Sequence, residues 1–211
     1  MNWMNLIDKW LLLLLTGLLL SLGATATQAQ ETPFDRLIGK FKEGVVFKSE
    51  FNHQYIDSYT GDTVETSGTI WVGENKYKVQ NNQQTVVVDG ETSRVYDKNR
   101  NRVIVSTYEA EEDDFAPSRF LNGADTTYTV ENQQEKESQT LITLASADPF
   151  SVFQQVEITL AGDLTPRRVF ARDQADNLIT TTFGAGSFIQ QEPGLFVLDY
   201  PKQAEIIDMR N

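Results

Sequence analysis

The chain has 211 residues, with 18 Lys and Arg against 30 Asp and Glu, which gives a formal net charge of −12. This length suits one ordinary domain, and 40% hydrophobic residues are enough for a packed core. The absence of Cys excludes disulfide scaffolds, thiol nucleophiles and Cys-ligated metal clusters, and a single histidine, His53, excludes mechanisms that need two imidazoles. Because an acidic surface repels phosphate backbones and anionic bilayers, we expect no nucleic-acid partner.

The N-terminus has the pattern of a secretory signal peptide. An apolar run, Trp10–Leu22, is too short for a comfortable membrane span and is followed by the small residues of Ala24–Ala29. We predict a signal peptide at residues 1–29, with cleavage after Ala29 or alternatively Ala26, and a single soluble, exported domain at 30–211. The alternative is an uncleaved N-terminal anchor.

A helix is expected at the start of the mature chain. Thr32 and Pro33 read as N-cap and first helical residue. Phe34, Leu37, Ile38 and Phe41 then follow at helical spacing and form one apolar stripe, which ends before Gly44.

From Val45 the hydrophobic period switches to two, which predicts strands separated by Gly, Asn and Asp turns. The predicted strands are 45–55, 64–72, 76–80, 85–89, 93–97, 102–108, 126–131, 140–147, 154–161, 167–173, 178–187 and 195–199. A loop and a short helix opened by Pro117 interrupt them at 109–123. The fold class is therefore mainly β, with one large curved antiparallel sheet and two helical pieces against one face.

Enzyme chemistry has little support in this sequence. His53 lies in a predicted strand with no nucleophile elbow beside it, and Gly184–Ser187 lacks the third glycine and the βαβ setting of a nucleotide site, so it reads as a strand bulge. The acidic run Glu109–Asp114 lacks the ligand spacing and central glycine of a calcium loop, which favours a solvated loop. We therefore predict no enzyme activity, no catalytic residues, no metal and no cofactor.

Five local patterns occur in an order that resembles the LolA family, the periplasmic carriers of outer-membrane lipoproteins. They follow the predicted helix and cover about Phe34 to Ile207. The segments that carry the resemblance are Phe51–Gln54, Ser67–Val72, Val86–Asp97, Phe115–Leu121 and Phe196–Pro201.

The resemblance implies an unclosed, half β-barrel with an N-terminal amphipathic helix and a short helical lid over a cavity for acyl chains. It implies a periplasmic, monomeric carrier that takes acylated lipoproteins from an inner-membrane ABC lipoprotein exporter to an outer-membrane acceptor or to the membrane. The alternative is a periplasmic half-barrel module that senses or binds acylated proteins or lipids without transporting them.

The acyl-chain site is predicted from inward parity on adjacent strands and from the helical stripe. Its predicted lining residues are Phe34, Leu37, Phe41, Phe47, Phe51, Ile70, Phe120 and Leu121. Family members often carry an Arg in the turn after Trp71-Val72, where it holds the lid through helix carbonyls; this chain has Gly73-Glu74-Asn75 there, with Lys76 as the nearest base. We therefore expect the lid to be closed by apolar contact of the helical stripe.

Overall fold

The computed structural model describes residues 31–109, 113, 117–123 and 125–210. The predicted signal peptide lies outside these residues, as do most of the acidic run at 109–114 and the start of the segment at 115–121. By its internal contacts the chain divides into two units, of which Thr32–Asn211 holds all the described helices and strands. None of the helices in the described part is long and apolar enough to cross a membrane.

Helix α2 (Pro33–Lys42) begins where the sequence predicts. The Thr32 hydroxyl accepts a hydrogen bond from the Asp35 amide, and the Asp35 carboxylate accepts one from the Thr32 amide, which completes a capping box. Phe34, Leu37 and Phe41 are buried along one side of the helix. The cap therefore fixes the start of the helix, and the stripe fixes which side faces the sheet.

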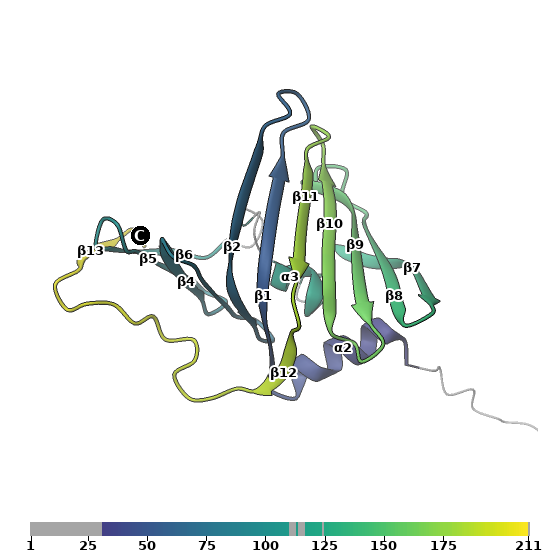
Figure 1. Cartoon of the computed structure of the whole chain (residues 1–211), viewed down its shortest axis with the longest axis horizontal. Helices are drawn as coiled ribbons and strands as arrows, with labels where there is room; N and C mark the ends of the chain where they lie inside the picture. Colours follow the sequence, from purple (N-terminus) through teal and green to yellow (C-terminus); the bar gives the residue numbers. More distant parts are fainter. Residues whose placement is uncertain (1–30, 110–112, 114–116, 124, 211) are drawn as a thin grey trace, which may run out of the picture. The chain divides into compact units, whose positions relative to one another are not determined.

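The strands form one sheet of 13 members (Figure 1). Their bounds are β1 (Val45–Ile56), β2 (Thr63–Val72), β3 (Tyr77–Gln80), β4 (Gln84–Val88), β5 (Thr92–Asp97), β6 (Arg102–Thr107), β7 (Tyr128–Lys136), β8 (Gln139–Ser146), β9 (Phe153–Ala161), β10 (Pro166–Asp173), β11 (Leu178–Phe183), β12 (Ser187–Gln190) and β13 (Glu205–Asp208). The short helix α3 (Pro117–Leu121) lies between β6 and β7 in the chain.

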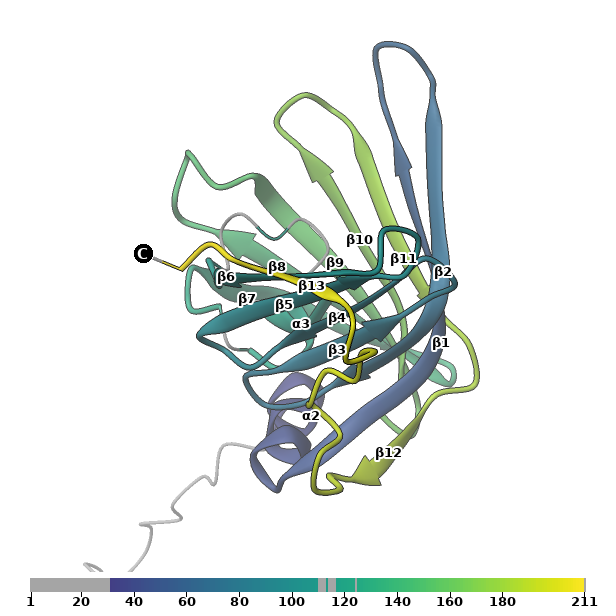
Figure 2. The same cartoon turned by 90° about the vertical axis from the view of Figure 1, so that its left-hand side faces the viewer.

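The order of strands across the sheet is β13-β6-β5-β4-β3-β2-β1-β11-β10-β9-β8-β7, with β12 paired to β1 beside β11. Strands β13 and β7 end this path, so the sheet is not closed into a barrel. Figures 1 and 2 both show α3 on the concave side of the sheet and α2 along its lower end. The predicted mainly β, unclosed architecture is thus confirmed.

Three details of the predicted sheet are wrong. It is mixed rather than purely antiparallel, because β13 pairs with β6 in parallel. The expected strand at 195–199 is absent: Leu195 and Val197 donate from their amides to the carbonyls of Glu192 and Gly194 in turns. Phe196 and Leu198 pack against a sheet face while Val197 is exposed, so the alternation of a strand arises in a loop.

The third wrong detail of the predicted sheet is the strand at 178–187. It is divided into two strands, β11 and β12, at its glycines. Both parts pair with the long strand β1, at Phe51–Ile56 and at Val45–Lys48, and the Gly184 amide donates to the Glu50 carbonyl between them. A side chain at Gly186 would collide with the Phe47 ring. The bulge predicted at Gly184–Ser187 is thus a division between two strands. Because Gly186 has no side chain, the buried Phe47 ring packs closely against its backbone.

Each face of the sheet carries its own apolar cluster. The larger cluster joins α2, α3 and the concave face from β1 to β3 and from β8 to β11. The smaller one lies on the opposite face, where Val87, Val103 and Val105 pack with Leu198 of the segment that leads to β13. The segment that carries Leu198 and leads to β13 therefore packs on the convex face of the sheet, while α2 and α3 pack on the concave face.

The two helices meet at Gly123, directly after α3. A Cβ atom at Gly123 would lie 2.6 Å from Cδ1 of Ile38 on α2, and its backbone has φ +65°. Only glycine satisfies both constraints without strain.

We predict that Gly123→Ala destabilises the protein by about 1–3 kcal/mol, because it adds a clash to a left-handed backbone. The matched control is Gly39→Ala in α2, where an added Cβ meets nothing within 4 Å; it should stabilise the protein by about 0.4–1 kcal/mol. Chemical denaturation measures the free energy of unfolding of both variants. Equal changes of the same sign in the two variants would contradict the close approach of Ile38 to Gly123.

Candidate functional site

All eight residues predicted to line an acyl-chain site are buried, and all belong to the larger apolar cluster. Leu37, Phe41, Phe47, Ile70 and Leu121 have no exposed surface. The structure thus brings together side chains from α2, β1, β2 and α3, which are far apart in the chain.

Aromatic rings make much of this packing. The Phe47 ring contacts those of Phe183 and Phe188 at centroid distances of 5.5 and 5.6 Å. On the other side of the cluster, Phe120 contacts Tyr128 edge-on at 5.2 Å, and Phe153 at 6.0 Å. Such edge contacts add a little to the free energy of area burial alone. Phe120 is therefore one of the described side chains through which α3 attaches to the β7–β9 part of the sheet.

A cavity of about 270 Å³ lies beneath the two helices. Phe34 and Ile38 of α2, Phe120 of α3, and Tyr128 and Leu144 of the sheet contribute to its lining. Of the eight predicted residues, Phe34 and Phe120 line it, and the other six pack in the surrounding core. This cavity is therefore small and borders the core, with the Arg119–Asp125 pair among its lining residues.

A second cavity, of about 440 Å³, lies on the β2–β6 part of the concave face, and sequence reasoning missed it. Its walls are mostly hydroxyl, amide and carboxyl side chains. The lining residues are Thr66, Tyr77, Val79, Asn81, Gln84, Val86, Ser93, Ser106, Thr107, Tyr108, Glu109 and Asp113. Tyr77 and Val79 also belong to the larger apolar cluster, so this cavity borders it directly.

The strand register explains why the concave face becomes polar toward β6. Paired residues share a face, and one row across the sheet reads Val72, Tyr77, Val88, Ser93, Ser106. The row is largely apolar on β2 to β4 and carries hydroxyls on β5 and β6. This change of polarity along one inward row was visible in the sequence only once the register was known.

A tyrosine holds a carboxylate at this cavity, and a second tyrosine lies beside it. The Tyr77 hydroxyl donates to Oδ2 of Asp113 at 2.5 Å, and the Tyr108 ring packs edge-on against the Tyr77 ring at a centroid distance of 6.4 Å. Burial, and then the charge of Asp113, raise the pKa of both Tyr77 and Tyr108. The raised pKa values favour the protonated phenols, which can donate hydrogen bonds.

Helix α3 is tied to the β2–β3 turn by the residue that follows its C-terminal end. The buried Asn122 amide donates from Nδ2 to the carbonyls of Gly73 (3.0 Å) and Glu74 (2.6 Å). Nζ of Lys76, the nearest base in this turn, lies 5.6 Å from the centroid of the Phe196 ring. A polar contact therefore joins α3 to the turn, with the donor on the helix side.

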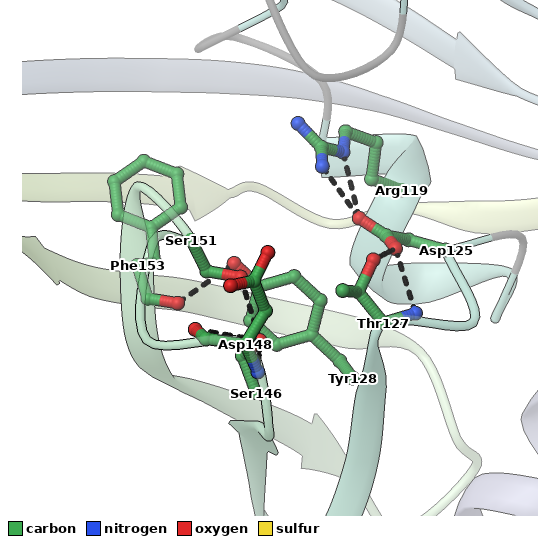
Figure 3. A network of polar contacts seen from close by, with 8 residues as sticks. All are labelled: Arg119, Asp125, Thr127, Tyr128, Ser146, Asp148, Ser151 and Phe153. Atoms are coloured by element: carbon green, nitrogen blue, oxygen red, sulfur yellow. Dashed lines mark hydrogen bonds and ion pairs between the residues drawn. The ribbon is translucent and has the colours of Figure 1, made fainter.

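A nearly buried ion pair ties α3 to the start of β7 (Figure 3). Nη2 and Nε of Arg119 lie 2.5 and 3.1 Å from Oδ2 of Asp125, and the Thr127 amide and hydroxyl donate to Oδ1. Burial acts to raise the pKa of Asp125, but the hydrogen bonds from Thr127 and Arg119 outweigh it and hold that pKa below its ordinary value. In the same network the Tyr128 hydroxyl donates to the Phe153 carbonyl at 2.8 Å.

The histidine and the metal-ligating side chains of the described part can be placed as follows. Nδ1 of His53 lies 2.9 Å from the Thr181 hydroxyl, on the strand where the sequence places it. No group of three or more metal-ligating side chains occurs among the residues that the structure describes. What the described part presents is a pair of cavities along one apolar cluster.

Neither a family model nor a curated protein matches the chain. Among solved structures it is similar to an uncharacterized conserved protein from Thermus thermophilus, at 10% identity and a TM-score of 0.52, over 84% of this chain and 99% of that one. It is also similar to a LolA superfamily protein from Nitrosomonas europaea, at 9% identity and a TM-score of 0.43, over 78% and 97% of the two chains.

A third similar structure is a provisionally named outer membrane lipoprotein-sorting protein domain from Vibrio parahaemolyticus, at 10% identity and a TM-score of 0.40, over 77% of this chain and 95% of that one. The likeness to the Thermus protein shows that the two chains share a fold. A LolA superfamily protein and a lipoprotein-sorting protein domain are thus among the solved structures to which the chain is similar.

The Arg119–Asp125 ion pair makes the stability of the folded protein depend on pH. Because the pKa of Asp125 in the folded protein is below its ordinary value of 3.8, the ion pair stabilises the fold above that value and ceases to do so as pH falls through the folded pKa. Asp125→Asn should cost about 3 kcal/mol at pH 7, since it leaves a nearly buried guanidinium without its partner charge.

The loss of stability caused by Asp125→Asn should be smaller at pH 3 than at pH 7, because Asp125 is then ionised less and stabilises the wild-type fold less. Thermal unfolding of both proteins across this range measures the difference. If the difference in stability between the two proteins does not change with pH, the charge of Asp125 contributes nothing to the stability of the fold.

Proposed function

We propose that this protein is a periplasmic carrier that shields the acyl chains of lipoproteins during transfer from the inner to the outer membrane. The observation that carries the proposal is the continuous apolar cluster, covered by two helices, that borders an open and partly polar cavity. An acylated protein anchor has the same two parts: long apolar chains and a polar end.

The energetics of an acyl chain in water require such a site. Each exposed CH₂ group costs about 0.8 kcal/mol, so several long chains cannot travel free through an aqueous compartment. Their release also requires that the shield open again. Two short helices held by a few contacts meet this requirement better than a closed barrel would.

In this proposal the predicted residues act in two groups. Phe47, Phe51 and Ile70 form the floor on the sheet, while Phe34, Leu37, Phe41, Phe120 and Leu121 form the cover. Acyl chains enter when the cover lifts, and they then pack on the floor in its place. Since burial of one Leu or Phe contributes roughly 1.5–3 kcal/mol, an incoming chain of comparable apolar area offsets the cost of lifting the cover.

The remaining parts of the proposal follow from the sequence. The N-terminal pattern provides export through a cleaved signal peptide, and the net charge of −12 keeps the carrier off anionic bilayers between its two stops. The donor is an inner-membrane ABC exporter, and the acceptor is an outer-membrane protein or the membrane itself, as the resemblance to the LolA family implies.

The test uses a synthetic fluorescent peptide with an S-diacylglyceryl cysteine at its N-terminus, loaded into donor vesicles. The protein should extract the lipopeptide into the soluble fraction and deliver it to acceptor vesicles. Phe47→Glu should reduce extraction at least ten-fold, because it places a charge in the apolar floor on which the acyl chains pack. Tyr59→Glu is the control, since Tyr59 is 96% exposed on the β1–β2 turn.

Circular dichroism checks that both variants keep the sheet. If the wild type leaves the lipopeptide in the donor vesicles, the carrier function is wrong. If it binds the peptide equally with and without acyl chains, a module that binds proteins without transporting lipid is the better account.

A further inference from the structure

The charge of the larger cavity is unusual for a chamber that borders a lipid-binding core. Two of its lining residues are acids, Glu109 and Asp113, and none of the described lining residues is Lys or Arg. The other polar groups of the wall are neutral donors and acceptors, among them the hydroxyls of Thr66, Ser93 and Ser106 and the amides of Asn81 and Gln84.

Two described bases near this part of the fold already have partners: Lys98 binds the backbone carbonyl of a lining residue, and Arg119 binds a carboxylate that does not line this cavity. Nζ of Lys98 donates to the Asn81 carbonyl at 2.5 Å, and Arg119 is paired with Asp125. Asp113 is held at the cavity by the hydroxyl of Tyr77, which is 4% exposed. A ligand group that enters therefore meets neutral hydrogen-bonding groups and at least one fixed negative charge in a partly desolvated space.

We propose that this cavity receives the polar end of the amphiphile and selects it by charge: it accepts uncharged or amine-bearing groups and rejects groups that end in a carboxylate or phosphate. An anion placed there loses hydration and gains no opposite charge, and it lies within the screening length of two carboxylates. A glycerol ester or amide loses less hydration and finds hydroxyl and amide partners. This inference rests on the proposed function, and it names the class of ligand.

The selection follows from the same register that makes the wall polar. Ser93 and Ser106 continue an inward row whose other members, on β2 to β4, are largely apolar. The apolar end of a ligand therefore points toward β3 and the helices, and its polar end toward β5 and β6. Asp113, bonded to Tyr77 of β3, lies where the apolar and polar parts of this wall meet.

The experiment compares three amphiphiles with the same twelve-carbon chain: monododecanoyl glycerol, dodecylamine and dodecanoate. Each displaces the uncharged probe N-phenyl-1-naphthylamine from the protein at pH 7 and low salt. We expect the glyceride and the amine to displace the probe at concentrations at least ten-fold below that of dodecanoate. Higher salt should bring the concentrations at which dodecylamine and dodecanoate displace the probe closer together, because it screens the charges of the cavity.

Asp113→Asn should reduce the preference for the glyceride over dodecanoate at least three-fold, because the amide keeps an acceptor for the Tyr77 hydroxyl and removes the charge. Glu135→Gln is the matched control: Glu135 is exposed on β7, outside the cavity, and the substitution changes net charge by the same amount. Equal shifts in the two variants would overturn the inference, because they would assign the preference to net charge.

The outcomes separate this inference from the function on which it rests. If all three amphiphiles displace the probe equally well, the apolar site stands and the selection by charge is wrong. If dodecanoate displaces it best, the inference is likewise wrong. If none of the three displaces the probe, and the diacylated lipopeptide is not extracted, the carrier proposal fails together with it.

Discussion

The fold depends on the burial of a concave apolar sheet face that the sheet cannot cover by itself. The sheet has two free ends, at β13 and β7, so the strand path does not close over its interior. The stripe of α2 and the side chains of α3 cover this face, and Leu37, Phe41 and Leu121 become fully buried as a result. Removal of that cover would expose the floor formed by Phe47, Phe51 and Ile70. The same surface is thus a folding core when covered and, in the proposed function, a lipid-binding surface when uncovered.

The contacts that hold the cover are few and differ in kind. Helix α2 is fixed by its capping box and its apolar stripe, and it joins β1 directly through the turn at Gly44. Helix α3 is only five residues long, and its described contacts come from Phe120 and Leu121 in the core, from Arg119 on Asp125, and from Asn122, just after the helix, on the β2–β3 turn. A helix this short gains little from its own hydrogen bonds. We infer that α3, rather than α2, is the part that moves first when a ligand enters.

Much of the architecture could be predicted from local sequence patterns, because periodicity and caps are local properties. The start of α2 at Thr32, the inward parity of Phe47 and Phe51, and an irregularity at Gly184–Ser187 were all readable in this way, although a bulge was predicted there and not a division into two strands. The C-terminal strand was not: Phe196 and Leu198 alternate because they cover a sheet face, while Glu205–Asp208 has exposed, charged ends and gains strand structure only from parallel pairing with β6.

The site was predictable in its apolar part and not in its polar part. Large buried side chains are indicated by hydrophobic periodicity, so the eight predicted residues could be found without knowledge of the partners of each strand. The polar cavity depends on which strands neighbour each other: Ser93 and Ser106 become a wall only when β5 and β6 are paired beside β4. The tie at Asn122 also depends on tertiary position, since it joins residues 48 and 49 positions apart.

The central claim is that acyl chains reach the apolar floor only when α3 moves away from the β2–β3 turn. Because the chain has no cysteine, a pair introduced at Asn122 and Glu74 can be oxidised to link these two elements without competing thiols. Nδ2 of Asn122 lies 2.6 Å from the Glu74 carbonyl, so the two positions are adjacent in the closed protein. The account predicts that the oxidised double variant does not bind the diacylated lipopeptide, that dithiothreitol restores binding, and that Asn122→Cys alone shows no such dependence on oxidation. Undiminished binding by the linked protein would contradict the claim.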